Sequence, residues 1–114
     1  MRFIAIAVFI LTPCASLAEF WCGGPTQNDE NICAMEQWQV ADNELNRLWK
    51  EIKPRADARG VGQALLTEQR AWLKRRDATC QQELAGGGSA AQMFYWSCME
   101  QQTINRNKEL ATWR

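Results

Sequence analysis

Cysteine is the residue type in this chain with the widest range of possible chemistry, and the 114 residues include five of them. A reactive thiol is typical of a Cys-X-X-Cys motif or of a neighbouring histidine, and a structural zinc site usually pairs cysteines about two to four residues apart. Cys22, Cys33, Cys80 and Cys98 have neither spacing, and the chain contains no histidine. We therefore expect two disulfides, with no metal and no cofactor.

The absence of histidine also removes most of the side-chain catalysts that hydrolases use, because Ser-His-Asp triads, Cys-His pairs and histidine metal sites all need that residue. Carboxylate pairs remain as acid–base candidates. However, Asp42 and Glu44 are two residues apart on a predicted helix and point in different directions. The run Gly86–Gly88 is not followed by the Gly-Lys-Ser/Thr of a phosphate-binding loop. These patterns predict a protein that is not an enzyme.

Residues 1–18 have the pattern of a secretory signal peptide. Arg2 precedes an apolar run, Phe3–Leu11, and small residues stand just before a cleavage point between Ala18 and Glu19. The uncharged stretch is shorter than the roughly 20 residues of a membrane-spanning helix. We predict a mature domain of residues 19–114 that is periplasmic or secreted and has no membrane span after cleavage.

Apolar residues recur at helical spacing in three stretches of the mature chain, and no stretch shows the alternation of a strand. The stripes predict helices over residues 29–53, 63–84 and 90–112. The two connections are short, which favours up-down-up connectivity. The predicted fold is all-α: a compact three-helix bundle stapled by two disulfides.

Local signals suggest where these helices begin and end. Asn28 or Asp29 can cap the first helix, and Pro54 is expected to end or kink it. Three consecutive glycines form a strong stop after the second helix, and Ser89 can cap the third.

Four cysteines permit three disulfide pairings. If the second and third helices form a hairpin about the glycine run, Cys80 and Cys98 lie near its closed end, and Cys22 is left to pair with Cys33. The competing pairing joins Cys33 to Cys80, because an antiparallel bundle also brings the start of the first helix near the end of the second. We favour the local pairs, of which the bond between Cys80 and Cys98 would contribute about 3 kcal/mol through chain entropy.

Three polar residues fall on the predicted inner stripes, namely Gln69 and Arg76 in the second helix and Arg106 in the third. A buried arginine needs a carboxylate or carbonyl partner, because an unpaired buried charge is costly. The hypothesised partners are the carboxylates of Asp42, Glu44 and Asp77.

The aromatic residues divide by helical register. Four of the six tryptophans fall on inner stripes and are expected in the core: Trp38, Trp72, Trp96 and Trp113. Aromatic residues off the core are frequent anchors of protein interfaces. The candidate partner-binding residues are therefore those that lie beside a stripe, near a helix start or in the N-terminal arm: Trp21, Trp49, Phe94 and Tyr95.

The charge balance does not suggest a nucleic-acid surface, which would usually show a basic excess. The chain has 13 Lys and Arg and 13 Asp and Glu, and loss of Arg2 with the signal peptide leaves a net charge of −1. Such a balance gives little attraction to a strongly basic protein unless acidic groups cluster on one face.

A series of short motifs runs along the chain from Cys22 to Leu110. They are Thr26-Gln27, Asn31-Ile32-Cys33, Asp42 to Asn46 with Trp49 following, Leu66 with Gln69 to Leu73, Arg76-Asp77, Cys80, Gly87 to Ser89, Cys98, Thr103, Arg106 and Leu110. Together these motifs resemble the LprI-like lysozyme inhibitor family, in which a Tyr is common at the position of Trp49 and a Met at that of Glu30.

This resemblance implies a secreted or periplasmic all-helical domain with disulfides. For some members it implies inhibition of lysozyme, so the expected partner is a protein, with a lysozyme as the leading candidate and no nucleic acid involved. The alternative is a cell-envelope interaction module without inhibitory activity. Some members are lipoproteins, but here Pro13 disfavours a lipid on Cys14.

Overall fold

The computed structural model describes Cys22 and residues 24–113, and the predicted signal peptide and Trp21 lie outside the described residues. Three α-helices make up most of the described chain: α1 is Gln27–Ala58, α2 is Gly62–Ala85 and α3 is Ala91–Ala111. The described residues contain no strand, so the predicted all-α class is confirmed.

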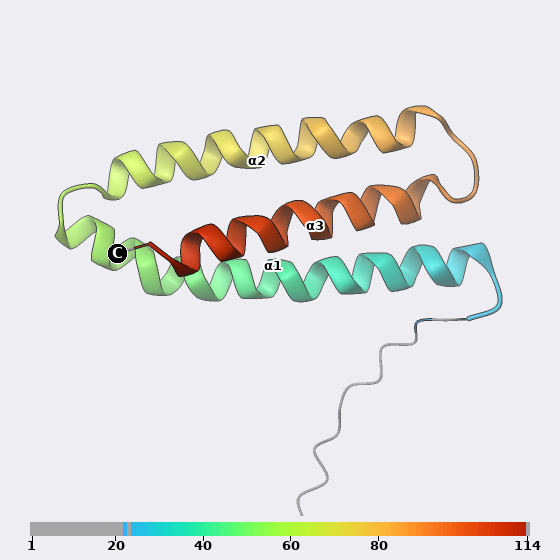
Figure 1. Cartoon of the computed structure of the whole chain (residues 1–114), viewed down its shortest axis with the longest axis horizontal. Helices are drawn as coiled ribbons and strands as arrows, with labels where there is room; N and C mark the ends of the chain where they lie inside the picture. Colours follow the sequence, from blue (N-terminus) through green and yellow to red (C-terminus); the bar gives the residue numbers. More distant parts are fainter. Residues whose placement is uncertain (1–21, 23, 114) are drawn as a thin grey trace, which may run out of the picture.

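The helices run up, down and up, as predicted, so α1 and α3 are parallel and α2 is antiparallel to both (Figure 1). α3 lies between α1 and α2 over most of its length and packs against each of them. The starts of α1 and α3 lie side by side, because Asn31 Nδ2 donates a hydrogen bond to the Ser89 carbonyl at 3.0 Å. One end of the bundle therefore holds the N-termini of α1 and α3 and the C-terminus of α2.

The largest apolar cluster lies toward the opposite end, where all three helices meet. Its members are the buried residues Leu45, Leu48, Ile52, Ala56, Leu65, Trp72 and Leu110. Those from α1 follow the spacing of the predicted stripe, which shows that the 3.6-residue period placed this face correctly. Burial of this apolar surface is the main stabilising term at this end.

α1 begins earlier than predicted, because Thr26 rather than Asn28 or Asp29 is its N-cap. The Thr26 hydroxyl accepts from the Asp29 N–H at 3.1 Å, and the Asp29 carboxylate accepts from the Thr26 N–H at 3.2 Å. This reciprocal pair is a capping box, which satisfies two backbone donors at the helix start. The predicted start of this helix was wrong by a few residues, because several neighbouring polar side chains are able to cap a helix N-terminus.

The prediction that Pro54 ends or kinks the first helix near Lys53 was wrong, since α1 continues to Ala58. Proline removes one backbone hydrogen bond but is itself exposed here. Ile52 and Ala56, on either side of it, are among the most buried residues of the chain. Their packing in the apolar cluster holds the helix together across the missing bond.

The connection between α1 and α2 is consequently shorter than predicted. Gly60 has a φ of 76°, which a residue with a side chain rarely adopts. The Gly60 N–H donates to the Asp57 carbonyl and the Val61 N–H to the Ala56 carbonyl, both at 3.0 Å. These two bonds form a Schellman motif, which stops α1 and turns the chain into α2.

The glycine run ends α2 as predicted, with positive φ angles at Gly87 and Gly88. The expected side-chain cap at Ser89 was wrong, because Ala90 is the N-cap of α3 and no side chain caps it. Ser89 instead contributes its carbonyl, which accepts the hydrogen bond from Asn31. Ser89 therefore links the start of α3 to α1 through its backbone.

Both favoured disulfides are present, so the competing Cys33–Cys80 pairing was wrong. Cys22 is bonded to Cys33 with a Cα–Cα distance of 5.0 Å, and Cys80 to Cys98 with 5.5 Å. The first joins the N-terminal arm to α1, and the second joins α2 to α3. Both lie toward the end of the bundle that holds the glycine turn, away from the large apolar cluster.

Candidate interaction surfaces

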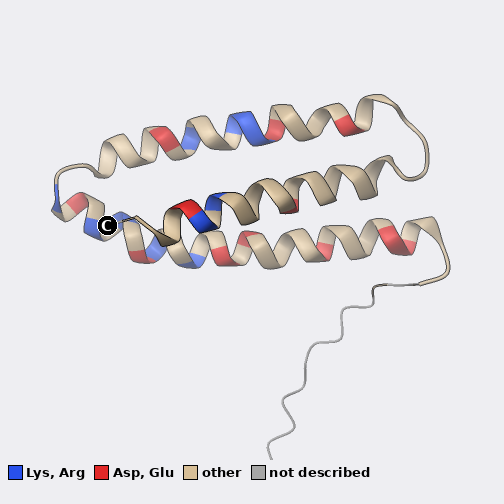
Figure 2. Ribbon diagram, viewed as in Figure 1, with Lys and Arg blue, Asp and Glu red and all other residues tan. Residues whose placement is uncertain are grey.

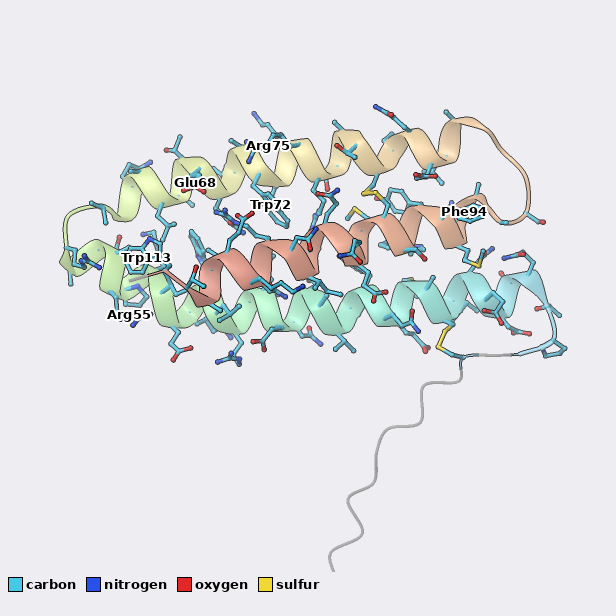
Figure 3. The ribbon with its side chains drawn as sticks, viewed as in Figure 1. Arg55, Glu68, Trp72, Arg75, Phe94 and Trp113 are labelled. Carbon is cyan, nitrogen blue, oxygen red and sulfur yellow. A yellow bond between two sulfur atoms is a disulfide. The ribbon has the colours of Figure 1, made fainter. Side chains whose placement is uncertain are left out.

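A layer of buried polar side chains joins α2 to α3. Gln69, Arg76 and Arg106 are all buried, at positions that the stripes placed inside. Trp72 lies among them, between α2 and α3 (Figure 3). The Arg76 and Arg106 Cζ atoms lie 5.1 and 5.8 Å from the centroid of the Trp72 ring, within the range of a cation–π interaction.

Arg76 meets one of its three hypothesised partners. Its Nε donates to Asp77 Oδ1 at 3.0 Å, and its Nη1 lies 3.4 Å from Thr103 Oγ1 on α3. The other two hypothesised partners, Asp42 and Glu44, were wrong. Both belong to α1, whereas the two guanidinium groups lie between α2 and α3.

Arg106 has partners that the sequence reading did not name. Its Nε donates to Gln69 Oε1 at 2.8 Å, and its Nη1 donates to Glu68 and Glu109 at 2.9 Å each. The Arg106 side chain is 4% exposed, whereas the two carboxylates are 59% and 65% exposed. The buried charge is thus neutralised from the surface, and this network joins α2 to α3.

Of the four tryptophans expected in the core, Trp72 is buried, and Trp38, Trp96 and Trp113 are only half-buried. Trp38 and Trp96 join α1 to α3 with ring centroids 4.8 Å apart. Trp113 lies at the opposite end, under the guanidinium groups of Arg55 and Arg59. Three helices side by side leave one edge of each interface open to solvent, which explains the partial burial (Figure 1).

The candidate partner-binding residues do not form one surface. Phe94 is 53% exposed near the start of α3, at the end of the bundle opposite Trp113 (Figure 3). Tyr95 beside it is half-buried and meets Trp96 edge-on, with centroids 4.8 Å apart. Trp49 belongs to a different place, between α1 and α2. Trp21 lies outside the described residues.

Trp49 lines a groove of about 290 Å³ between α1 and α2, which we call the Trp49 groove. Its α1 wall carries Asp42, Asn46 and Trp49, whose spacing of four and three residues places them on one helical face. On the α2 wall, Leu66, Arg70 and Leu73 have the same spacing of four and three residues. The remaining lining residues are Leu45 and Gln69.

A second groove, of about 430 Å³, lies between α1 and α3. It is mainly apolar, with Val40, Leu48 and Ile104 among its lining residues, and Glu44 and Arg47 also line it. Arg47 donates to Glu44 at 2.6 and 2.8 Å, and this hydrogen bonding lowers the pKa of Glu44 and raises that of Arg47. These two charges are therefore already paired within the chain.

Charge is strongly segregated along the bundle, a feature that the balanced composition hides. Residues 22–46 and 77–105 contain eight carboxylates and no Lys or Arg. Because α2 is antiparallel to α1 and α3, both segments lie at the end with the glycine turn, which we call the acidic end (Figure 2). Residues 47–76 and 106–113 form the basic end, with eleven cations and four carboxylates. The sequence contained the runs, but only the helix order brings them together.

Exposed apolar side chains also concentrate at the acidic end. Among the described residues, four large hydrophobic side chains are notably exposed, and Ile32, Val40 and Phe94 belong to the acidic end. Val61, between α1 and α2, is the fourth and lies at the basic end. The acidic end thus exposes more large apolar side chains than the basic end does.

In the described part of the chain, no helix is both long and apolar enough to cross a membrane. Within the same residues, no group of three or more His, Cys, Asp or Glu side chains is placed to hold a metal ion.

Comparisons with known proteins agree with the motifs and the fold. An uncharacterized protein of Rhizobium meliloti (strain 1021) is 33% identical over 132 aligned positions, which cover 96% of this chain and 94% of that protein. No solved structure matches. The family model for lysozyme inhibitor LprI matches residues 22–110, a span that runs from the first paired cysteine to the last buried leucine of α3. The chain therefore belongs to the LprI lysozyme inhibitor family.

Proposed function

We propose that the exported chain inhibits a lysozyme-type peptidoglycan hydrolase by binding the enzyme and blocking its cleft. The observation that carries this proposal is the family match over residues 22–110, nearly the whole mature domain. A binding role also agrees with a fold whose buried polar groups are used to join helices rather than to form a reactive cleft.

We propose the acidic end as the surface that meets the enzyme. Its eight carboxylates with no intervening cation would attract a strongly basic lysozyme and speed its association. Phe94 and Ile32 would supply the apolar contact that long-range attraction alone does not give. The two disulfides brace the same end, so little ordering entropy would be lost on binding.

The disulfides and the family match also bear on where in the cell the protein acts. Two disulfides are typical of an oxidising compartment, and the lysozyme inhibitor family agrees with a place outside the cytoplasm. We propose that residues 1–18 are a cleaved signal peptide and that residues 19–114 act in the periplasm or after secretion. Mass spectrometry of the protein from its native envelope fraction should give an N-terminus at Glu19.

The test of inhibition is a lysis assay with oxidised protein of residues 19–114. The protein should slow clearing of a peptidoglycan suspension by a basic lysozyme at near-stoichiometric ratios. No slowing with any of several lysozyme types would overturn the proposal. Recovery from envelope extract of a different protein partner, together with normal lysis, would instead support an envelope interaction module.

A further inference from the structure

The Trp49 groove is lined by both apolar and polar side chains. The Trp49 ring packs against the large apolar cluster and also lines the groove, as does Leu73 on the opposite wall. Leu66 adds a third apolar contact. The groove therefore offers an aromatic ring supported from behind by the core, so that the ring would be held in place before any ligand arrives.

The polar groups around this ring have no partners within the described chain. No hydrogen bond or ion pair among the described residues uses the side chains of Asp42, Asn46 or Arg70. Their neighbours differ, because Glu44 and Lys53 on α1 are both paired. Asp42 is half-buried, whereas Asn46 and Arg70 are exposed, so all three side chains are accessible to a ligand in the groove.

Gln69 adds a fourth polar group to the groove. Its Oε1 accepts from Arg106 Nε at 2.8 Å, and no hydrogen bond among the described residues uses its Nε2 donor. The groove thus combines acceptors on Asp42 and Asn46 with donors on Asn46, Gln69 and Arg70. One cation and one carboxylate also make it nearly neutral, which does not suit a phosphate-rich ligand.

We infer that the Trp49 groove binds a pyranose unit of an oligosaccharide. A sugar ring presents an apolar face of C–H groups, which can pack on the ring of Trp49, and an edge of hydroxyl groups that both donate and accept hydrogen bonds. Planar amide, carboxylate and guanidinium groups beside an aromatic ring match those two surfaces. The groove volume of about 290 Å³ is at the small end of the range for ligand sites, which suits one or two sugar rings.

This site lies between α1 and α2 and does not include Phe94 or Ile32, the apolar contacts proposed for lysozyme. Five of its eight lining residues belong to the basic end, the other three (Asp42, Leu45 and Asn46) lie where the acidic end borders it, and Phe94 lies at the far end of the bundle (Figure 3). Saccharide binding therefore goes beyond inhibition, and it can be tested without any lysozyme present. Failure of one proposal does not decide the other.

The test is a titration of the oxidised protein of residues 19–114 with tri-N-acetylchitotriose and, separately, with maltotriose. Binding is followed by isothermal titration calorimetry and by NMR. We expect saturable binding of at least one trisaccharide, with amide shifts at Asn46 and Arg70. Asn46→Ala and Arg70→Ala should each weaken binding by roughly three- to tenfold. The matched controls are Asn43→Ala and Lys74→Ala, which remove exposed side chains of the same helices outside the groove and should leave binding unchanged.

Trp49→Tyr serves as a milder probe of the ring, because a smaller aromatic residue keeps the packing on the core and should retain weaker binding. Lack of saturable binding by both trisaccharides up to about 10 mM would overturn the inference. Binding that weakens equally in the groove and control variants would also overturn it. So would shifts in the groove with a lysozyme peptide but not with either sugar.

Discussion

Arg75 and Arg76 are neighbours in the chain, yet their side chains occupy opposite environments. Arg75 is exposed, whereas Arg76 is buried beside Trp72 and bonded to Asp77 and Thr103. Helical periodicity predicted this difference, because Arg76 continues the stripe of Leu65, Gln69 and Trp72. Its partners were harder to predict, since they depend on the rotation and axial offset of α2 against α3, and one sequence does not specify these.

Arg76→Ala should lower the free energy of unfolding by roughly 2–3 kcal/mol, because it removes a buried side chain together with its contacts to the Trp72 ring and to Thr103. Arg75→Ala is the matched control and should stay within about 0.5 kcal/mol of wild type. Urea unfolding of the oxidised proteins measures both. Equal stability of the two variants would show that the buried arginine does not stabilise the α2–α3 interface.

Phe94 is the residue through which the acidic end is expected to contact a partner. Phe94→Ala should raise the concentration for half-inhibition of lysis by roughly fivefold or more, because truncation of an interface anchor usually costs above 1 kcal/mol. Val61→Ala, which shortens an exposed apolar side chain at the basic end, should leave inhibition unchanged. Melting temperatures check that both variants fold. Equal inhibition by Phe94→Ala and wild type would remove Phe94 from the proposed surface.

At the scale of elements, tertiary contacts decided where the helices begin and end when the local sequence signals were ambiguous. The apolar periodicity predicted the three helices, and the short connections predicted their up-down-up arrangement. The expected hairpin of the second and third helices predicted the disulfide pairs. Pro54 did not end α1, because buried packing on both sides offset one missing hydrogen bond. Ser89 did not cap α3, whose N-cap is Ala90, and its carbonyl accepts a hydrogen bond from Asn31 on α1. These outcomes depend on neighbours that are distant in sequence, so local patterns could not reveal them.

The capping box gives a test at this scale. Thr26→Ala should lower the free energy of unfolding by about 1 kcal/mol, because it removes the acceptor for the Asp29 N–H at the start of α1. Asn28→Ala is the control, since Asn28 is exposed and is not the cap. Denaturant unfolding with both disulfides intact compares the two. A larger effect from Asn28→Ala would mean that the helix starts where the sequence signal first suggested.

For the whole molecule, the feature with most bearing on function is the separation of charge. Net charge near zero predicted weak attraction to a basic protein, with the condition that acidic groups do not cluster. They do cluster, because antiparallel packing of α2 places residues 77–85 at the same end of the bundle as the first halves of α1 and α3 (Figure 2). A sequence-only estimate misses this, since charge runs acquire a position only when the topology and helix lengths are known.

Neutralising the acidic end should therefore slow association with a basic lysozyme. Glu36→Gln with Glu83→Gln is expected to reduce the association rate by roughly three- to tenfold at low salt, and added salt should shrink the difference. Glu51→Gln with Asp57→Asn changes the net charge equally at the basic end and should not slow association. Stopped-flow or surface-based kinetics gives the rates. The same rate for both double variants would exclude steering by the acidic end.

The most direct measurement of the central claim is the footprint of a basic lysozyme on the backbone amides of this protein, followed by NMR at equimolar ratio. The acidic end should respond, with the largest shifts near Ile32, Glu83 and Phe94, while amides near Arg59 and Val61 keep their positions. Largest shifts at the basic end, or inhibition of lysis without any change at the acidic end, would contradict the proposed docking surface.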